Sequence, residues 1–365
     1  MTSERVTLEA SALAAAMRQA AAVVEARNTI PILANVRIEV VGDALELVTT
    51  DLDIECRRMV PLAAPGGALA CTVDARRLAM LAQAVPAGAQ LGMAIDETGR
   101  LLVTSGRSRW VLPVLPVTDF PTLPFEADGT ALEVPGKVLA EAIARTAPSV
   151  STEQIRYYLC GTLLDTEDGK LRFVSTDGAR AFVAQTGVPL ADPPEMIVPA
   201  KFMVALKGMA EAGPVGLELH RTRLRARQGD TVLTGKAIDG TFPQYRRIVP
   251  PEGTPLRVDP VLLRAALKRV GLVASKQTEV VKLALEPDRL TVSVTDPAGG
   301  TASEEVACEC GDTFEVGFCA RYLDQMLEVV GGDSVEIHIA IPGSPALFRR
   351  VVSDAAFGVL MPYRI

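Results

Sequence analysis

Histidine and aromatic residues are scarce in this chain of 365 residues. It has two histidines, and aromatic residues make up 4% of the composition. Its six cysteines form no C-x-x-C pair, and neither histidine lies near them in the sequence, so the usual ligands of a zinc site are missing. We expect no metal or cofactor and reduced, mostly buried cysteines. A metal or redox pair at Cys308 and Cys310 stays open, because C-x-C places both thiols on one face of a strand.

The chain also lacks the common motifs for catalysis. It contains no G-x-G-x-x-G after a strand, no G-x-x-x-x-G-K-[ST], no H-E-x-x-H and no G-x-S-x-G, and nothing nominates a nucleophile or a general base. It has no run of 18 apolar residues, and its first residues, MTSERVTLEA, contain no apolar signal core. The sequence therefore predicts a soluble, cytoplasmic protein that is not an enzyme.

Three weakly similar segments follow one another. Each begins with a triplet that we expect to open a helical pattern, and the triplets are spaced by 124 residues: Leu8-Glu9-Ala10, Leu132-Glu133-Val134 and Leu256-Arg257-Val258. Two alternating apolar runs come next and end in Thr-Asp at Asp51, Asp177 and Asp296, which is typical of a β-hairpin. A strand leading into a second helix follows, and each segment closes on an apolar-Pro pair.

The repeat predicts three α+β domains of one kind, at 1–129, 130–253 and 254–365. Their boundaries fall in the polar, Gly- and Pro-bearing stretches EADGT and PPEGT. Each domain is expected to pack two helices on antiparallel sheets. The helices are predicted at 10–27, 73–84, 137–147, 200–210, 260–272 and 320–330.

Positive charge is concentrated in these helix windows. They hold 12 basic and 5 acidic residues, whereas the remaining chain holds 25 basic and 39 acidic residues and the net charge is −7. Arginine and lysine are good helix formers, which is one explanation, but glutamate is one too and does not follow them. A basic helical layer that faces a polyanion is the interpretation we favour.

Six motifs, in order along the whole chain, resemble the β sliding clamp family of bacterial DNA polymerase III. They are RNTIPILANV (27–36), SGRSRW (105–110), RYYLCG (156–161), STDGAR (175–180), DGTFPQYRRIVP (239–250) and LMPYRI (360–365). The resemblance implies a head-to-tail homodimer, in which six domains form a ring around duplex DNA with the helices lining the hole. Such a clamp confers processivity on the replicative polymerase and contacts phosphates without reading sequence.

The resemblance also assigns residues. The DNA contacts of the family map onto Arg27, Arg76, Arg156, Tyr157, Tyr158 and Lys201. Glu153 replaces a polar neutral residue of some relatives, so an acid there is expected to weaken that contact. The alternative for the two tyrosines is a role in the core.

A hydrophobic pocket of the family takes linear peptides from the polymerase III α subunit, the clamp loader, other polymerases and repair proteins. Its wall maps onto Leu159, Thr176, Gly178, Arg180, Pro243, Arg247, Ile248, Tyr322, Val359, Met361, Pro362, Tyr363 and Arg364. Departures from the family at Ala179, Ala181 and Tyr363 affect the peptide preference and not the existence of the pocket.

The dimer contact of the family maps onto Arg107, Arg109, Trp110, Leu112, Val273, Ala274, Glu304 and Glu305. Trp110 is the only tryptophan, and a lone tryptophan is more often in the core than at an interface. Two other functions stay open: a peptide-docking scaffold or clamp paralogue that does not support replication, and an enzyme of unknown chemistry.

Overall fold

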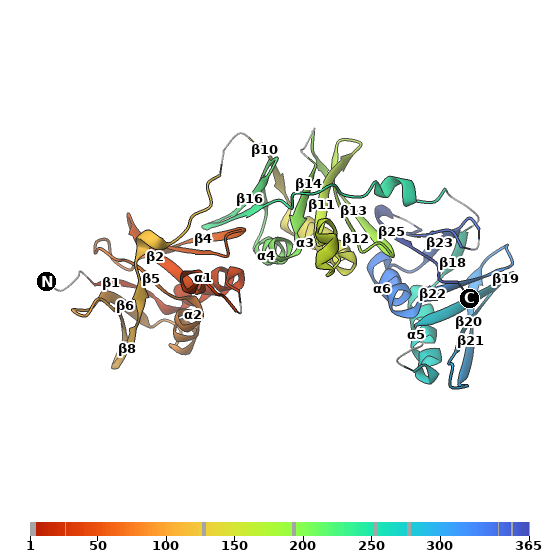
Figure 1. Ribbon diagram of the computed structural model, residues 1–365, viewed down its shortest axis with the longest axis horizontal. Coiled ribbons are helices and arrows are strands. Elements are labelled where there is room, and N and C mark those ends of the chain that lie inside the picture. Colours follow the sequence, from red (N-terminus) through yellow and green to blue (C-terminus); the bar gives the residue numbers. More distant parts are fainter. Residues whose placement is uncertain are drawn as a thin grey trace. The chain divides into compact units, whose positions relative to one another are not determined.

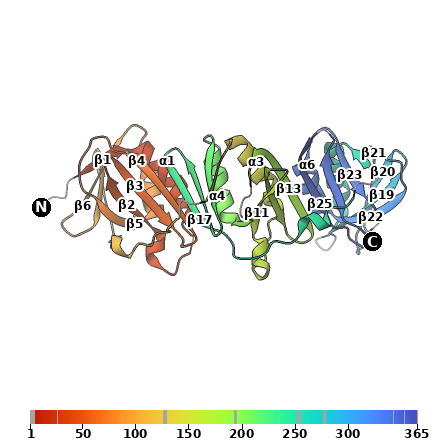
Figure 2. The same ribbon diagram turned by 90° about the horizontal axis from the view of Figure 1, so that it is seen from above.

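The computed structural model describes residues 5–25, 27–125, 129–191, 195–251, 255–275, 279–341, 343–351 and 353–364 (Figures 1 and 2). Residue contacts divide the chain into two compact units. The first unit combines Met1–Ala140 with Lys201–Ala237, and the second combines Glu141–Ala200 with Ile238–Ile365. Each unit is described separately below.

One order of elements occurs three times along the described residues. The first copy contains β1 (Val6–Glu9), α1 (Ala10–Val23), η1 (Pro31–Ala34), β2 (Asn35–Val41), β3 (Ala44–Thr50), β4 (Ile54–Pro61), β5 (Ala70–Asp74), α2 (Ala75–Ala84), β6 (Gln90–Ile95), β7 (Leu101–Ser105), β8 (Ser108–Leu112), β9 (Val114–Leu115) and η2 (Val117–Asp119). The second contains β10 (Thr130–Val134), α3 (Gly136–Thr146), η3 (Ala147–Ser149), η4 (Gln154–Leu159), β11 (Gly161–Glu167), β12 (Lys170–Thr176), β13 (Arg180–Pro189), β14 (Met196–Pro199), α4 (Ala200–Ala210), β15 (Val215–His220), β16 (Arg223–Gln228), β17 (Thr231–Lys236) and η5 (Tyr245–Ile248). The third contains β18 (Pro255–Val258), α5 (Pro260–Val270), η6 (Gly271–Val273), β19 (Val280–Glu286), β20 (Arg289–Thr295), β21 (Thr301–Glu309), β22 (Phe314–Cys319), α6 (Ala320–Val330), β23 (Val335–Ile339), β24 (Ala346–Arg350) and β25 (Ser353–Leu360).

The predicted repeat is confirmed by this order and by the strand pairing. The three predicted hairpins are the antiparallel pairs β2–β3, β11–β12 and β19–β20. The turn of the second hairpin has Asp168 at φ +52° and Gly169 at φ +69°, the positive values that a tight two-residue hairpin turn needs. The six helices lie within about one turn of the predicted windows.

Two details of the prediction were wrong. Two of the marker triplets do not open helices: 132–134 lie in β10 and 256–258 in β18, and in the first triplet only Ala10 belongs to α1. The first helix ends at Val23 and not at 27, because Val24 is extended (ψ 125°) and turns its side chain into the core. Arg27 therefore lies in the loop after α1.

In the first unit, the described strands form a nine-stranded sheet in the order β10-β15-β16-β17-β4-β3-β2-β5-β9 and a four-stranded sheet in the order β1-β6-β7-β8. Helices α1 and α2 lie side by side against these strands (Figure 1). The stripe Leu13, Met17 and Ala20 of α1 is fully buried, because residues three and four apart share one face of a helix. The opposite face of α1 carries Arg18, which is exposed.

In the second unit, the described strands form one sheet of twelve in the order β14-β11-β12-β13-β25-β24-β23-β18-β21-β20-β19-β22. Helix α6 packs against β24 and β25 and lies beside β25 in Figure 2, and α5 packs against β20 and β21. The core between them contains Leu263 and Leu267 of α5 with Leu323 and Leu327 of α6.

Both sheets combine strands from different copies of the repeat. Strand β17 of the second copy pairs with β4 of the first, and β13 of the second copy pairs with β25 of the third. The hydrogen-bonded sheets therefore continue across the predicted domains, and their limits at 129 and 253 stay a prediction. Among the described helices, none is long and apolar enough to cross a membrane.

Candidate functional site

A cavity of about 330 Å³ opens in the second unit, and we call it cavity A. Its floor is apolar, with Leu159 and Val359 buried, and its rim holds the exposed residues Pro243, Ile248 and Met361. The full lining is Arg156, Tyr158, Leu159, Thr176, Gly178, Arg180, Pro243, Gln244, Tyr245, Ile248, Val359 and Met361. Eight of the thirteen residues predicted for the peptide pocket thus meet in one cavity.

The turn between β12 and β13 shapes one side of cavity A. The hydroxyl of Thr176 donates to the carbonyl of Arg180 (2.7 Å) and accepts from the amide of Gly178 (3.1 Å). Gly178 has φ +91°, and a Cβ there would lie 2.6 Å from Nη1 of Arg156. Glycine therefore allows both the turn and the close approach of Arg156.

Arg180 is a buried charged residue, and hydrogen bonds within the chain hold its guanidinium in place. It is 7% exposed, and its Nε donates to Oδ2 of Asp177 (3.1 Å). Its other nitrogens donate to Gln325 and to the carbonyl of Pro148, and the guanidinium lies 4.1 Å from the ring centre of Tyr322. Tyr322, predicted for the wall, contacts Arg180 and does not line cavity A.

Arg156 and Tyr158, which were predicted as DNA contacts, line cavity A. Nε and Nη2 of Arg156 donate to Oε2 of Glu153 at 3.0 and 2.8 Å, and this hydrogen-bonded carboxylate raises the pKa of Arg156. The carboxylate of Glu153 thus partly neutralises the positive charge of Arg156. Tyr157 is 50% exposed and meets the ring of Tyr158 edge to face at 5.8 Å, outside the cavity lining.

The other predicted pocket residues lie elsewhere. Pro362, Tyr363 and Arg364 follow β25 outside the lining, and the amide of Tyr363 donates to the carbonyl of Gly317 (2.8 Å). Arg247 lines a neighbouring cavity. The lining residues Gln244 and Tyr245 were missed, although they stand in DGTFPQYRRIVP between two residues that were predicted.

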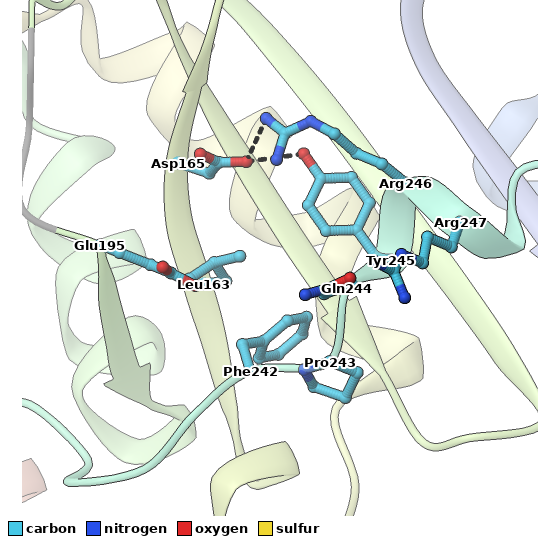
Figure 3. A pocket seen from close by; sticks show the side chains of 9 residues that line it. All are labelled: Leu163, Asp165, Glu195, Phe242, Pro243, Gln244, Tyr245, Arg246 and Arg247. Atoms are coloured by element: carbon cyan, nitrogen blue, oxygen red, sulfur yellow. Dashed lines mark hydrogen bonds and ion pairs between the residues drawn. The ribbon is translucent and has the colours of Figure 1, made fainter.

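That neighbouring cavity, which we call cavity B, has a volume of about 340 Å³ (Figure 3). It is lined by Leu163, Asp165, Glu195, Phe242, Pro243, Gln244, Tyr245, Arg246 and Arg247. Pro243, Gln244 and Tyr245 line both cavities. Nothing in the sequence pointed to cavity B, since its acidic residues lie 30 positions apart and outside the family motifs.

The predicted DNA contacts of the first unit differ in whether their charged groups form ion pairs within the chain. Arg27 and Arg76 are exposed, and the described residues offer neither side chain an ion-pair partner. Lys201, at the start of α4, forms ion pairs with Asp51 and with Glu25 (3.7 Å). Its charge is therefore partly neutralised within the chain.

Five of the eight residues predicted for a dimer contact lie on two strands with open edges: Arg109, Trp110 and Leu112 on β8, and Glu304 and Glu305 on β21. Arg107 precedes β8, whereas Val273 ends η6 and Ala274 follows it. In the described part of the first unit, β8 pairs only with β7; it carries Arg109, which is exposed, and Trp110, which is half-buried against the core. In the second unit, the described residues 301–307 of β21 pair only with β20.

Two of the predicted dimer acids already have partners within the chain. Arg269 donates from Nε to Glu304 (2.8 Å), and Arg289 lies 3.6 Å from Glu305. Leu272 is 84% exposed beside Val273, at 38%, and was missed. Exposed apolar side chains that adjoin one another are a signal for an interface, but exposure is not readable from a short apolar run.

The repeated domains, with paired helices on antiparallel sheets, define the class of sliding clamps. Models of the N-terminal, central and C-terminal domains of the DNA polymerase III beta subunit match residues 5–124, 133–244 and 246–364. The beta sliding clamp of Caulobacter vibrioides is 36% identical over 99% of this chain and 100% of its own length.

Solved structures agree with this match. A beta sliding clamp of C. crescentus has a TM-score of 0.93 at 36% identity and covers 99% of both chains. A sliding clamp of Pseudomonas aeruginosa bound to griselimycin has a TM-score of 0.94 at 33% identity and covers 100% of both chains. The chain belongs to the DNA polymerase III beta subunit family, and it is accordingly a DNA sliding clamp that confers processivity on the replicative polymerase.

Proposed function

We propose that two copies of this chain close head to tail into a ring around duplex DNA, with the described helices toward the DNA. The observation that carries this proposal is the set of helical cations that are exposed and have no acidic partner among the described residues: Arg18, Arg76, Arg77, Lys137, Lys207, Lys268 and Arg321. Unpaired cations at helix surfaces attract phosphates without reading bases, which suits a protein that slides.

The two open strand edges support ring closure. An exposed edge presents unpaired backbone groups and tends to pair with another chain. Strand β8 of one copy and β21 of the next offer such edges, with Trp110 and Leu272 as apolar contacts and Arg107 and Arg109 facing Glu304 and Glu305. Glu304 is held by Arg269 at two nitrogens, so Glu305 is the acid that we expect to contact the partner.

Leu272→Asp tests the ring. Because Leu272 is 84% exposed, the substitution leaves the fold of a single chain intact and places a charge in the contact, which favours the monomer. Native mass spectrometry measures the ratio of dimer to monomer. Ile341→Asp, at a position 64% exposed outside the proposed contact, is the matched control. Equal dimer fractions for both variants would refute the proposed interface.

The DNA contacts are tested by removing two exposed cations. Arg27→Ala combined with Arg76→Ala should lower the slope of log Kd against log salt by about one for each phosphate that the variant no longer neutralises. The control pair is Arg221→Ala with Lys170→Ala, which removes the same charge from two exposed positions outside the described helices. Topology is tested separately: a ring stays on closed circular DNA and leaves when the circle is cut, whereas a scaffold that does not encircle DNA shows no such difference.

We further propose that cavity A docks linear peptides of the polymerase α subunit, the clamp loader and repair proteins. The apolar floor and the exposed Met361 suit a promiscuous surface, because methionine adapts to different partners. Met361→Ala should weaken binding of an apolar peptide several-fold, and unchanged binding would count against this site. The chain has no catalytic role in this proposal and acts on DNA in the bacterial cytoplasm.

A further inference from the structure

Cavities A and B share Pro243, Gln244 and Tyr245 in their linings, and we call this shared segment the wall between them. The hydroxyl of Tyr245 donates to Oδ2 of Asp165 (2.7 Å), and Nη2 of Arg246 donates to the same oxygen (2.7 Å). The guanidinium of Arg246 also lies 4.9 Å from the ring centre of Tyr245, and Tyr245 is 3% exposed. Figure 3 draws the two hydrogen bonds to Asp165. These contacts hold Tyr245 in its place in the wall.

The other charges of cavity B are free. Glu195 and Arg247 are both exposed, and the side chains that the structure describes provide neither with a hydrogen bond or an ion pair. They lie on opposite sides of the cavity in Figure 3, with Phe242 and Pro243 below them. Leu163 and Phe242 are 2% and 3% exposed and form an apolar floor. An apolar floor between the carboxylate of Glu195 and the guanidinium of Arg247 is complementary to an amphipathic peptide chain and not to a phosphate backbone.

Gln244 stands on the ridge between the cavities. It lines both of them, it is exposed, and no described group pairs with its carboxamide. A carboxamide offers donors and an acceptor, so it can pair with the amide and carbonyl groups of a peptide backbone that crosses the ridge. The ridge is therefore continuous with the peptide site proposed for cavity A.

We propose that cavity B is a second subsite, which binds residues that flank the peptide in cavity A: one apolar side chain on Leu163 and Phe242, and one basic side chain at Glu195. This inference rests on the proposed function of cavity A. Each cavity measures only about 330–340 Å³, the lower end of the range for small-molecule sites. Two linked subsites raise affinity more than either alone, because the second contact is intramolecular.

The test compares synthetic peptides on the full-length protein by fluorescence anisotropy. The core peptide is apolar, built of leucine and phenylalanine, and capped at both ends. Two longer peptides carry Ala-Leu-Lys beyond one end or the other, and matched peptides carry Ala-Leu-Glu. One Leu-Lys extension is expected to tighten binding by about threefold or more, the size of a single exposed ion pair together with partial burial of leucine.

Glu195→Lys should abolish the gain from the lysine extension and give a gain to the glutamate extension, while the affinity of the core peptide stays unchanged. That last measurement also shows that the variant is folded. The net charge of −7 attracts any basic peptide, so Glu97→Lys, the same change at an exposed turn, serves as control and should leave the gain in place.

The outcomes separate the two proposals. If the core peptide binds and Met361→Ala weakens it, but neither extension adds affinity, cavity B is not a subsite and cavity A stands. If the gain survives Glu195→Lys, or is lost equally in Glu97→Lys, recognition by Glu195 is refuted. If the core peptide does not bind the wild-type protein, the function proposed for cavity A fails, and the subsite fails with it.

Discussion

Gly178→Ala is the sharpest single perturbation of cavity A. The residue has φ +91°, and the new Cβ would lie 2.6 Å from Nη1 of Arg156. A residue with a Cβ at positive φ costs about 1–2 kcal/mol of folding free energy. The clash itself is relieved when Arg156 moves, because its guanidinium ends a flexible side chain. Moving it separates Arg156 from Glu153, an exposed pair that adds little to stability.

Two measurements therefore give different results for this variant. Urea unfolding should show a loss of about 1–2 kcal/mol, the cost of the backbone alone. Anisotropy with the core peptide should show binding weakened by several-fold, since Arg156 lines cavity A and must leave its position.

Gly169→Ala is the matched control. Gly169 has φ +69° in the turn between β11 and β12, and no atom lies within 4 Å of its Cβ position. It should lose similar stability and bind the peptide like wild type. Equal peptide affinities of the two variants would falsify the role given to the packing of Arg156 on Gly178.

Three further predictions concern stability and reactivity. Tyr245→Phe removes the hydroxyl that donates to Asp165 and should lower the free energy of unfolding by about 1–3 kcal/mol, measured in urea; no loss would show that the wall between the cavities does not depend on this bond. Burial alone would raise the pKa of Glu336, but hydrogen bonds from Arg257, Arg349 and His338 outweigh it, so the pKa is lowered from 4.5. The stability from this depressed pKa is fully present above about pH 4.5 and is lost as the pH falls through the folded pKa. The stability of the Glu336→Gln variant should therefore depend less on pH in that acidic range, as measured by circular dichroism. An unchanged acid transition would contradict this. Burial raises the pKa of Cys56 and of Cys71 to about 12, so a thiol reagent at pH 8 should label both only in denaturant, and rapid labelling of the native protein would be the opposing result.

The sequence predicted the elements because their signals are local. Helical stripes such as Leu13, Met17 and Ala20 repeat at the helical period, and the hairpins carry their turn residues within the motif. The eight pocket residues that were predicted and that line cavity A were assigned from the resemblance to the family, not from periodicity.

The rest could not be predicted because it depends on distant contacts. Arg156 lies in cavity A because Gly178 leaves room for it and Glu153 holds it, and neither fact is visible in RYYLCG. Arg247, expected in the peptide pocket, lines cavity B, whereas the next residue along η5, Ile248, lines cavity A. Glu195 carries no motif at all and matters only because Arg247 lines the same cavity.

The shared sheets limit how this gene can be cut. Expression of residues 130–253 alone would separate β17 from β4 and β13 from β25, which pair over five residues each. Such a fragment would expose the unpaired edges of β17 and β13 to solvent and should precipitate or pair with itself. The three repeats in the sequence are thus not expected to fold when each is expressed alone, and truncation studies of this protein should divide it elsewhere.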